Sequence, residues 1–411
     1  MVSWLFAPYT GSADLDLFKR LHRCELDFVV IQARRERSDL RLLQLPASAT
    51  FERHEVVLPA GPRTREARDA FSRGAHDAFA RLSSKPDVLL SHSNEVPSHR
   101  VALELKRLHP ELPWVAYFGD VVRRNLYVPL MRDFPLFDED CETEAQTLAL
   151  ADLVICNNEV QRRWFCEQHP DAAARIVTVA HCFESGWYPS PSVPADSPFT
   201  FMHLGALYPI KRRAEPLLLA VELLLEVYPH LIGTFRMVFV GDDVPDDDLA
   251  AWRTMRHRDH VEFRPGVPYL DSLALMQRAH VLVIIDGVFD ATHDGVAESP
   301  YLPGKLADYL GARRPLLAIT MEQSPTADVL RARAEPIATD DPERIAFVMK
   351  RHLDGRVSSR HHTAARYRAE LAGASMELCL RAAISGTSAI KELPRLLRRL
   401  TQPIEEAIAC S

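Results

Sequence analysis

The sequence predicts an α/β protein made of two domains, each built around a parallel β-sheet. At 411 residues the chain exceeds what one hydrophobic core usually supports, so two domains of about 200 residues are expected. Hydrophobic residues make up 47% of the chain, which suits globular cores. Short apolar runs alternate with amphipathic helical stretches along both halves, and this alternation is typical of parallel strands connected by helices.

In the first half, the apolar runs predict seven strands, with helical periods between them. The first run has no basic segment and no small-residue cleavage site, so we expect a strand there and not a signal peptide. The predicted strands span residues 2–7, 28–32, 55–58, 88–91, 114–118, 153–156 and 176–180. The predicted helices span residues 14–23, 63–82, 98–108 and 158–168.

The second half shows the same alternation after a segment of different composition. Residues 188–198 are rich in proline and serine and have no apolar period, which predicts a linker. The predicted strands that follow span residues 200–204, 236–240, 261–263, 281–285 and 316–319. The expected domains are therefore residues 1–187 and 199–355, followed by a helical tail over residues 356–411.

Composition and missing motifs exclude several classes of function. A formal net charge of −7 argues against nucleic-acid binding, and no apolar run approaches the roughly 18 residues of a membrane span. The seven cysteines contain no CxxC pair, which argues against a zinc site or a disulfide framework and favours a reducing, cytoplasmic location. Acidic residues cluster at 138–140 and 246–248, but both clusters begin predicted helices, where acids favour the dipole, so no metal site is expected.

Residues 301–320 carry the most informative local pattern. Pro303 and Gly304 lead into a short helix with Lys305 near its start and Asp308 one turn later, and an apolar run follows. A helix start offers unpaired backbone N–H groups to an anion, and Lys305 adds a full positive charge there. Asp308 lies on the same helix face and can accept hydrogen bonds from sugar hydroxyls. The segment suits a nucleotide, although an ordinary surface helix with a spaced ion pair would have the same residues.

Together with residues 201–213 and 261–279, this segment resembles the nucleotide-sugar-binding domain of retaining glycosyltransferases of family 4 (glycosyl transferases group 1). The three motifs occur in the order of that family, and the likeness is closest to bacterial exopolysaccharide and surface-polysaccharide members. The resemblance implies the GT-B fold: two facing Rossmann-like domains with an interdomain cleft, and a C-terminal tail that returns to the first domain.

The same resemblance implies a site for a nucleoside diphosphate sugar. Lys211 and Lys305 are expected on the diphosphate as catalytic cations, with Gly304 beside them, and Asp308 on the ribose. The base is expected near Gly266 and Val267. The remaining residues expected at the donor are Gly205, Arg212 and Leu302.

The sequence departs from the family at two positions. Ala206 stands where many relatives have an arginine, and Pro300 stands where the first of two acids would be. Arg212 or Arg213 is a candidate to replace the missing arginine, although a basic turn of this kind is also typical of a solvated surface. Both departures leave open a catalytically silent partner subunit.

The first half is expected to provide the acceptor side. Residues 112–120 resemble the strand and acid of exopolysaccharide members, which makes Asp120 a catalytic-side candidate that orients sugar hydroxyls, or else a turn cap. Arg123 follows closely and is a candidate contact for the acceptor, or else a solvated side chain. His92 and His99 lie in the segment after another strand and are acceptor-side candidates, or else surface histidines.

The function expected from these residues is transfer of a sugar from a nucleoside diphosphate sugar to a hydroxyl acceptor, including a lipid-linked glycan, without metal or cofactor. A nucleotide-sugar epimerase of the same fold is the other alternative. Residues 391–400 place leucines at helical spacing with arginines between them. These leucines either pack the tail onto the first domain or support weak peripheral contact with the inner membrane face.

Overall fold

The computed structural model describes residues 1–7, 12–34, 51–59, 64–93, 96–127, 136–190, 198–242 and 244–409. The chain forms two compact units. Unit 1 comprises Met1–Cys182 and Arg366–Ser411, and unit 2 comprises Phe183–Ala365. Unit 2 thus begins before the predicted linker, most of which lies outside the described residues.

Unit 1 contains a seven-stranded sheet ordered β3-β2-β1-β4-β5-β6-β7, in which neighbouring strands are parallel. Sequence order runs outward on both sides from the neighbours β1 and β4, which is the doubly wound arrangement. The strands are β1 (Val2–Ser3), β2 (Phe28–Ala33), β3 (Phe51–Val56), β4 (Leu89–Ser93), β5 (Trp114–Phe118), β6 (Leu153–Cys156) and β7 (Ile176–Thr178). The helices between them are α1 (Ser12–Leu21), α2 (Arg65–Ala80), α3 (Pro97–Leu108), α4 (Phe137–Leu150) and α5 (Glu159–Gln168).

The strands of unit 1 match the sequence best where they are buried on both faces. All residues of β5 and β6 are buried, and both strands have the predicted bounds, because a doubly covered strand is a continuous apolar run. The edge strand β3 is only partly buried and lies at Phe51–Val56, not at residues 55–58. Glu52 and Glu55 are exposed, and charged residues on an edge strand weaken its apolar signal.

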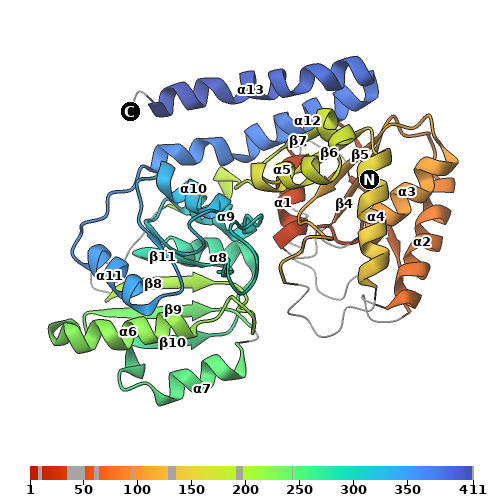
Figure 1. Cartoon of the computed structure of the whole chain (residues 1–411). Coiled ribbons are helices and arrows are strands. Elements are labelled where there is room, and N and C mark those ends of the chain that lie inside the picture. Colours follow the sequence, from red (N-terminus) through yellow and green to blue (C-terminus); the bar gives the residue numbers. More distant parts are fainter. Residues whose placement is uncertain are drawn as a thin grey trace. The chain divides into compact units, whose positions relative to one another are not determined.

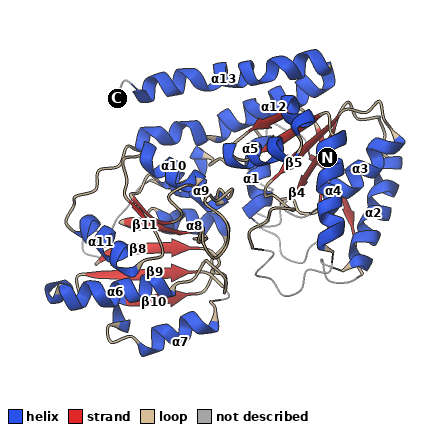
Figure 2. Ribbon diagram, viewed as in Figure 1, coloured by secondary structure: helices blue, strands red, loops and turns tan. Residues whose placement is uncertain are grey.

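Unit 2 contains a six-stranded parallel sheet ordered β10-β9-β8-β11-β12-β13. The strands are β8 (Phe199–Leu204), β9 (Phe235–Val240), β10 (Val261–Arg264), β11 (Val281–Ile285), β12 (Leu316–Ile319) and β13 (Ile337–Ala338). The helices are α6 (Glu215–Val227), α7 (Asp246–Thr254), α8 (Tyr269–Met276), α9 (Gly304–Ala312), α10 (Pro325–Ala332) and α11 (Pro342–Leu353). Figure 2 shows strands and helices alternating along the chain in both units.

A core of apolar side chains joins one face of this second sheet to α6 and α11. Phe201 and Met237 of the sheet are fully buried together with Val221 of α6 and Ile345 of α11. Burying a large apolar side chain contributes about 1.5–3 kcal/mol, so this cluster supplies a rigid base for the loops at the strand ends.

The helices α12 (Ala369–Ser385) and α13 (Thr387–Ala409) belong to unit 1 and lie side by side (Figure 1). Helix α12 packs against α1 at Gly373. A Cβ at Gly373 would lie 2.5 Å from Arg23 Cβ and 2.9 Å from the carbonyl oxygen of Arg20, so the close approach requires glycine. The C-terminal segment is thereby fastened to the first helix of the chain.

The prediction of an α/β protein with parallel sheets in two Rossmann-like domains is confirmed. The short strand β13 has no counterpart among the predicted strands, because two residues are too few for a strand period. The acids 138–140 lie in the first turn of α4 and the acids 246–248 in the first turn of α7, where the sequence predicts helix starts. Within the described ranges, no helix combines the length and apolar character that crossing a membrane requires.

Candidate functional site

The candidate site lies at the carboxyl edge of the sheet in unit 2. Gly205 follows β8, Asp286 follows β11 and Thr320 follows β12. Because these strands are parallel neighbours, their carboxyl ends meet at one edge. Sequence order diverges between β8 and β11, and ligands of open α/β sheets bind at such a switch point.

Lys305 approaches the backbone at the end of β8. It lies in the first turn of α9, whose N-cap residue Pro303 makes no side-chain hydrogen bond to the helix start. Gly205 has a φ of +116°, and a Cβ there would lie 2.6 Å from Lys305 Nζ. The lysine can take this position only because residue 205 is glycine. An uncapped helix start beside an ammonium group is suited to an anion.

Burial lowers the pKa of Lys305 to about 7, with a further lowering by Arg212 and an opposing effect of Asp286. Keeping the Lys305 side chain protonated therefore costs free energy while no anion is bound. An anion that binds beside it would offset this cost, because it stabilises the protonated form.

Arg212 lies next to this lysine and pairs with a buried acid. Its Nη2 is 3.4 Å from Asp286 Oδ1, and its guanidinium lies 5.2 Å from the ring centroid of Tyr208. Asp286 is fully buried, and the hydroxyls of Thr320 and Thr326 donate to its Oδ2. Burial raises the pKa of Asp286, while Arg212 opposes that rise. The ion pair with Asp286 thus orients the guanidinium of Arg212.

Lys211 makes an ion pair within unit 2. Its Nζ lies 2.6 Å from Asp294 Oδ2, and the hydrogen bond from Lys211 lowers the pKa of Asp294. The backbone of Lys211 has a φ of 64°, an uncommon conformation for a residue with a side chain. Asp294 therefore neutralises the lysine that the sequence assigns to the diphosphate.

The structure separates the two arginines that were candidates to replace the one missing at Ala206. Arg213 turns away to Asp248, with its Nε 3.2 Å from Oδ1. Asp248 is completely buried and accepts the backbone N–H groups of Ala214 and Glu215. This acid was expected as a solvated cap of its own helix; it instead caps the start of α6. Arg212 is thus the arginine at the candidate site.

Asp308 is 7% exposed and is held by two tyrosines of unit 2. Its Oδ1 accepts a hydrogen bond from the Tyr269 hydroxyl at 2.8 Å, and its carbonyl oxygen accepts one from the Tyr188 hydroxyl at 2.9 Å. Lys305 and Asp308 lie on one side of α9, as their spacing predicts. Tyr269 thus donates a hydrogen bond to one oxygen of the Asp308 carboxylate, which the sequence assigns to the ribose.

The residues expected near the base follow β10. The backbone N–H of Gly266 donates to Asp242 Oδ1 at 2.9 Å, and a Cβ at Gly266 would lie 2.7 Å from Oδ2. Val267 is 38% exposed, which leaves an apolar surface for a flat ring. Leu302 is buried just before α9, and Gly304 is its first residue.

In unit 1, Asp120 and Arg123 lie in the segment that follows β5. Asp120 is partly exposed and Arg123 is exposed. The buried carboxylate of Glu144 accepts the backbone N–H groups of Val122 and Arg123, at 2.6 and 3.1 Å. Glu144 therefore fixes the segment that carries both candidates.

The other two acceptor-side candidates are buried and do not lie in a surface loop. His92 belongs to β4 and stacks on Tyr117. His99 lies in the first turn of α3, with its Nδ1 2.9 Å from Ser91 Oγ. Each is 1% exposed, and burial lowers the pKa of each to about 3, so both rings are neutral. The expected surface position is corrected, because strand β4 extends to Ser93 and helix α3 begins at Pro97, so both histidines lie in regular elements. Their acceptor-side role stays a prediction.

Several site residues were not found from the sequence: His203, Asp286, Tyr269, Asp294 and Glu144. For Asp286 a signal exists, since an acid directly after a buried strand lies at the ligand-binding edge of the sheet. His203 lies in a mostly apolar strand, where a buried polar side chain indicates a specific partner.

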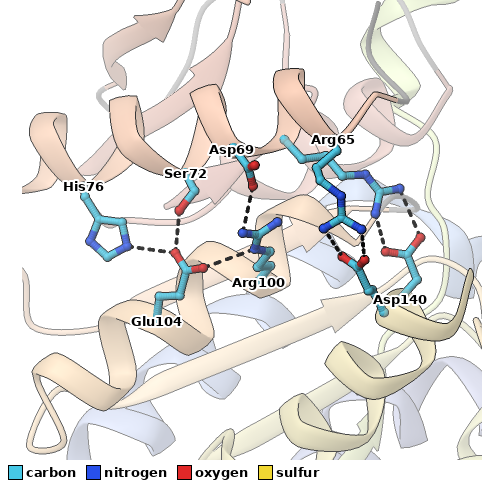
Figure 3. A network of polar contacts seen from close by, with 9 residues as sticks. Arg65, Asp69, Ser72, His76, Arg100, Glu104 and Asp140 are labelled. Atoms are coloured by element: carbon cyan, nitrogen blue, oxygen red, sulfur yellow. Dashed lines mark hydrogen bonds and ion pairs between the residues drawn. The ribbon is translucent and has the colours of Figure 1, made fainter. Parts of the chain in front are cut away.

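The acids at the start of α4 form ion pairs with arginines of α2 in unit 1. Arg68 Nη1 lies 2.5 Å from Asp140 Oδ1, and Arg100 bridges Asp69 and Glu104 (Figure 3). Glu139 and Asp140 of α4 are thus paired with Arg65 and Arg68 of α2. Among the residues that the structure describes, no group of three potential ligands could hold a metal ion.

No protein-family model matches the sequence, and no curated protein is similar to it at a significant level. Solved structures are similar over nearly the whole chain. The α,α-trehalose-phosphate synthase (UDP-forming) from Burkholderia xenovorans is 14% identical, with a TM-score of 0.61 over 97% of this chain and 99% of that one. WaaG, a glycosyltransferase involved in lipopolysaccharide biosynthesis, is 12% identical, with a TM-score of 0.59 over 98% and 100%.

The chain has the GT-B fold. The GT-B architecture is also that of a UDP-N-acetylglucosamine 2-epimerase, 14% identical with a TM-score of 0.59 over 92% of this chain and 94% of that one. At such identities the likeness concerns the fold, and the function has to be argued from the GT-B site itself.

Proposed function

We propose that this protein is a glycosyltransferase that uses a nucleoside diphosphate sugar as donor. The observation that carries the proposal is the close approach of Lys305 to Gly205 at the uncapped start of α9, with Arg212 alongside. Two cations and backbone N–H groups at a switch point are suited to a diphosphate, and they stabilise the charge that a departing nucleoside diphosphate accumulates.

The donor is proposed to lie along the carboxyl edge of unit 2. Its diphosphate would contact Lys305, Arg212 and Lys211, and its ribose would contact Asp308. The base would rest near Gly266 and Val267, where the exposed apolar surface of Val267 supports stacking.

The finer assignments extend this proposal to the acceptor. Transfer would retain the anomeric configuration and take place on a hydroxyl acceptor, including a lipid-linked glycan, in surface-polysaccharide synthesis, with Asp120 and Arg123 on the acceptor side. A cytoplasmic location is part of the proposal, supported by the unpaired state of the cysteines that the structure describes.

A donor panel tests the proposal directly. Nucleoside diphosphate sugars that differ in base and sugar are screened by thermal shift, because a ligand at 100 Kd stabilises a protein by about 2.7 kcal/mol. For the donor found, hydrolysis to free sugar is then measured in Lys305→Ala and Lys211→Ala. Each variant should lose about 10²-fold in turnover.

The control variant is Lys85→Ala, which removes an exposed lysine of unit 1 paired with Glu111 and should keep full turnover. A protein that binds no member of the panel would refute the proposal. Binding without any turnover would identify the silent partner subunit. Conversion of the sugar without release of the nucleotide would identify the epimerase.

A further inference from the structure

His203 is a buried polar side chain inside strand β8, close to the proposed diphosphate site. It is 1% exposed, and its Nδ1 lies 2.9 Å from the carbonyl oxygen of Val283 in β11. Because a carbonyl oxygen only accepts hydrogen bonds, this contact requires a hydrogen on Nδ1. Burial, and then the charge of Lys305, keep the pKa of His203 well below its ordinary value. The ring is therefore neutral, and Nε2 carries no hydrogen.

The unprotonated Nε2 faces Lys305. The distance from Lys305 Nζ to His203 Nε2 is 3.5 Å, and a Cβ at Gly205 would lie 2.6 Å from the same Nζ. Two charged groups also act on Lys305: Arg212 repels it and Asp286 attracts it. The hydroxyl of Tyr309, which lies in α9 with Lys305, accepts a hydrogen bond from the backbone N–H of Leu204. His203 thus offers a neutral acceptor to this ammonium without adding a competing negative charge.

We propose that His203 is a positioning residue, which accepts a hydrogen bond from the Lys305 ammonium and holds it beside Gly205 to meet the phosphates of the donor. The identity of the anion rests on the proposed function. The contact between the two side chains can be tested without any ligand.

The arrangement has a consequence for the pH dependence of donor binding. Burial lowers the pKa of Lys305 to about 7. Below pH 7 the ammonium is present before the donor binds, whereas above pH 7 binding must take up a proton, so affinity falls as the pH rises. Removing the His203 acceptor lowers the pKa of Lys305 further. Such a variant therefore loses more donor affinity at high pH than at low pH.

The titration of Lys305 tests the contact in the ligand-free protein. In protein labelled with ¹³C-lysine, the Cε signal of Lys305 is assigned with Lys305→Arg and followed by NMR as a function of pH in the wild type, His203→Phe and His203→Gln. A hydrogen bond to a charged group predicts a midpoint lower by about one pH unit in His203→Phe. His203→Gln keeps an acceptor and should restore most of the shift.

The control variant is His260→Phe, which removes another buried histidine of unit 2 that accepts from the backbone of Gly233. Its Lys305 midpoint should equal that of the wild type. An unchanged midpoint in His203→Phe would overturn the inference. An equal shift in His203→Gln or in His260→Phe would also overturn it, because the effect would then not depend on an acceptor at position 203.

Donor binding separates this inference from the proposed function. Nucleoside diphosphate sugars are used, because their phosphates do not titrate near pH 7. His203→Phe should bind the donor about tenfold more weakly at pH 8 and nearly normally at pH 6. If no nucleotide sugar raises the Lys305 midpoint of the wild type, the proposed function fails while the ligand-free titration still decides the role of His203.

Discussion

Single residues at the end of β8 control where the site cations lie. Gly205 combines a φ of +116° with a Cβ position 2.6 Å from Lys305 Nζ, so alanine there meets both backbone strain and a collision. We expect Gly205→Ala to displace the lysine and to weaken donor binding by at least about tenfold.

Gly233→Ala is the matched control, since Gly233 also has a positive φ, of 80°, but no atom lies within 4 Å of its Cβ position. It should lose stability by strain alone and keep donor binding. Isothermal calorimetry and thermal unfolding of both variants provide the comparison. Equal donor affinity in the two would show that the contact of Gly205 with Lys305 does not matter for binding.

Asp294 is the residue that competes most directly with a diphosphate, because its carboxylate neutralises Lys211 at 2.6 Å. Asp294→Asn should make Lys211 available and tighten donor binding by about two- to fivefold, the range of a partly exposed ion pair. The measurement is a donor titration beside Asp328→Asn, which removes an exposed acid paired with Arg331 in α10. Weaker binding in Asp294→Asn would mean that the acid orients Lys211.

Secondary-structure elements place these residues with little freedom. The backbone N–H of Leu204 at the end of β8 donates to the hydroxyl of Tyr309 in α9 at 2.8 Å, and that hydroxyl lies 3.3 Å from the carbonyl oxygen of the same leucine. The end of β8 and the start of α9 are therefore joined, although they are far apart in sequence. This joint keeps Lys305 near Gly205.

Helix α13 presents basic residues on its outer side. Leu393 is completely buried and Ile390 nearly so, whereas Leu396 is 39% exposed and the arginines at 395, 398 and 399 are exposed. Part of the leucine pattern thus packs within unit 1, and Leu396 stays exposed among the arginines. We expect weak binding to anionic vesicles, at about 1 kcal/mol for each basic residue.

Vesicle flotation at low and high salt measures this contact. Replacing the three arginines by glutamate should abolish it, and vesicles without anionic lipid should not bind. Binding that persists at high salt, or in the triple variant, would instead indicate apolar insertion.

At the level of the whole protein, the proposed reaction depends on charges that the chain itself provides. Lys211, Lys305, Arg212 and the start of α9 are proposed to neutralise the leaving diphosphate, so activity should persist in EDTA. Donor hydrolysis is measured in metal-free buffer, with Mg²⁺ or Mn²⁺ added back as the control. Loss of activity in EDTA that either ion restores would contradict a cationic side-chain mechanism.

The sequence by itself determined the α/β class, the bounds of strands β5, β6, β11 and β12, and the pairing of Lys305 with the start of α9. These features depend on apolar periods and on residues close together in the chain, and such local signals persist whatever the tertiary arrangement. The bounds of strand β3 were predicted wrongly, because an edge strand carries a weak apolar signal.

Only the tertiary structure decided which distant residues meet. His203 lies 102 positions from Lys305, and the two become neighbours because β8 ends beside α9. The choice of Arg212 over Arg213, and the burial of His92 and His99, follow equally from strand order and packing. Sequence patterns report the face on which a residue lies, whereas contacts between faces depend on which elements the sheet topology brings together.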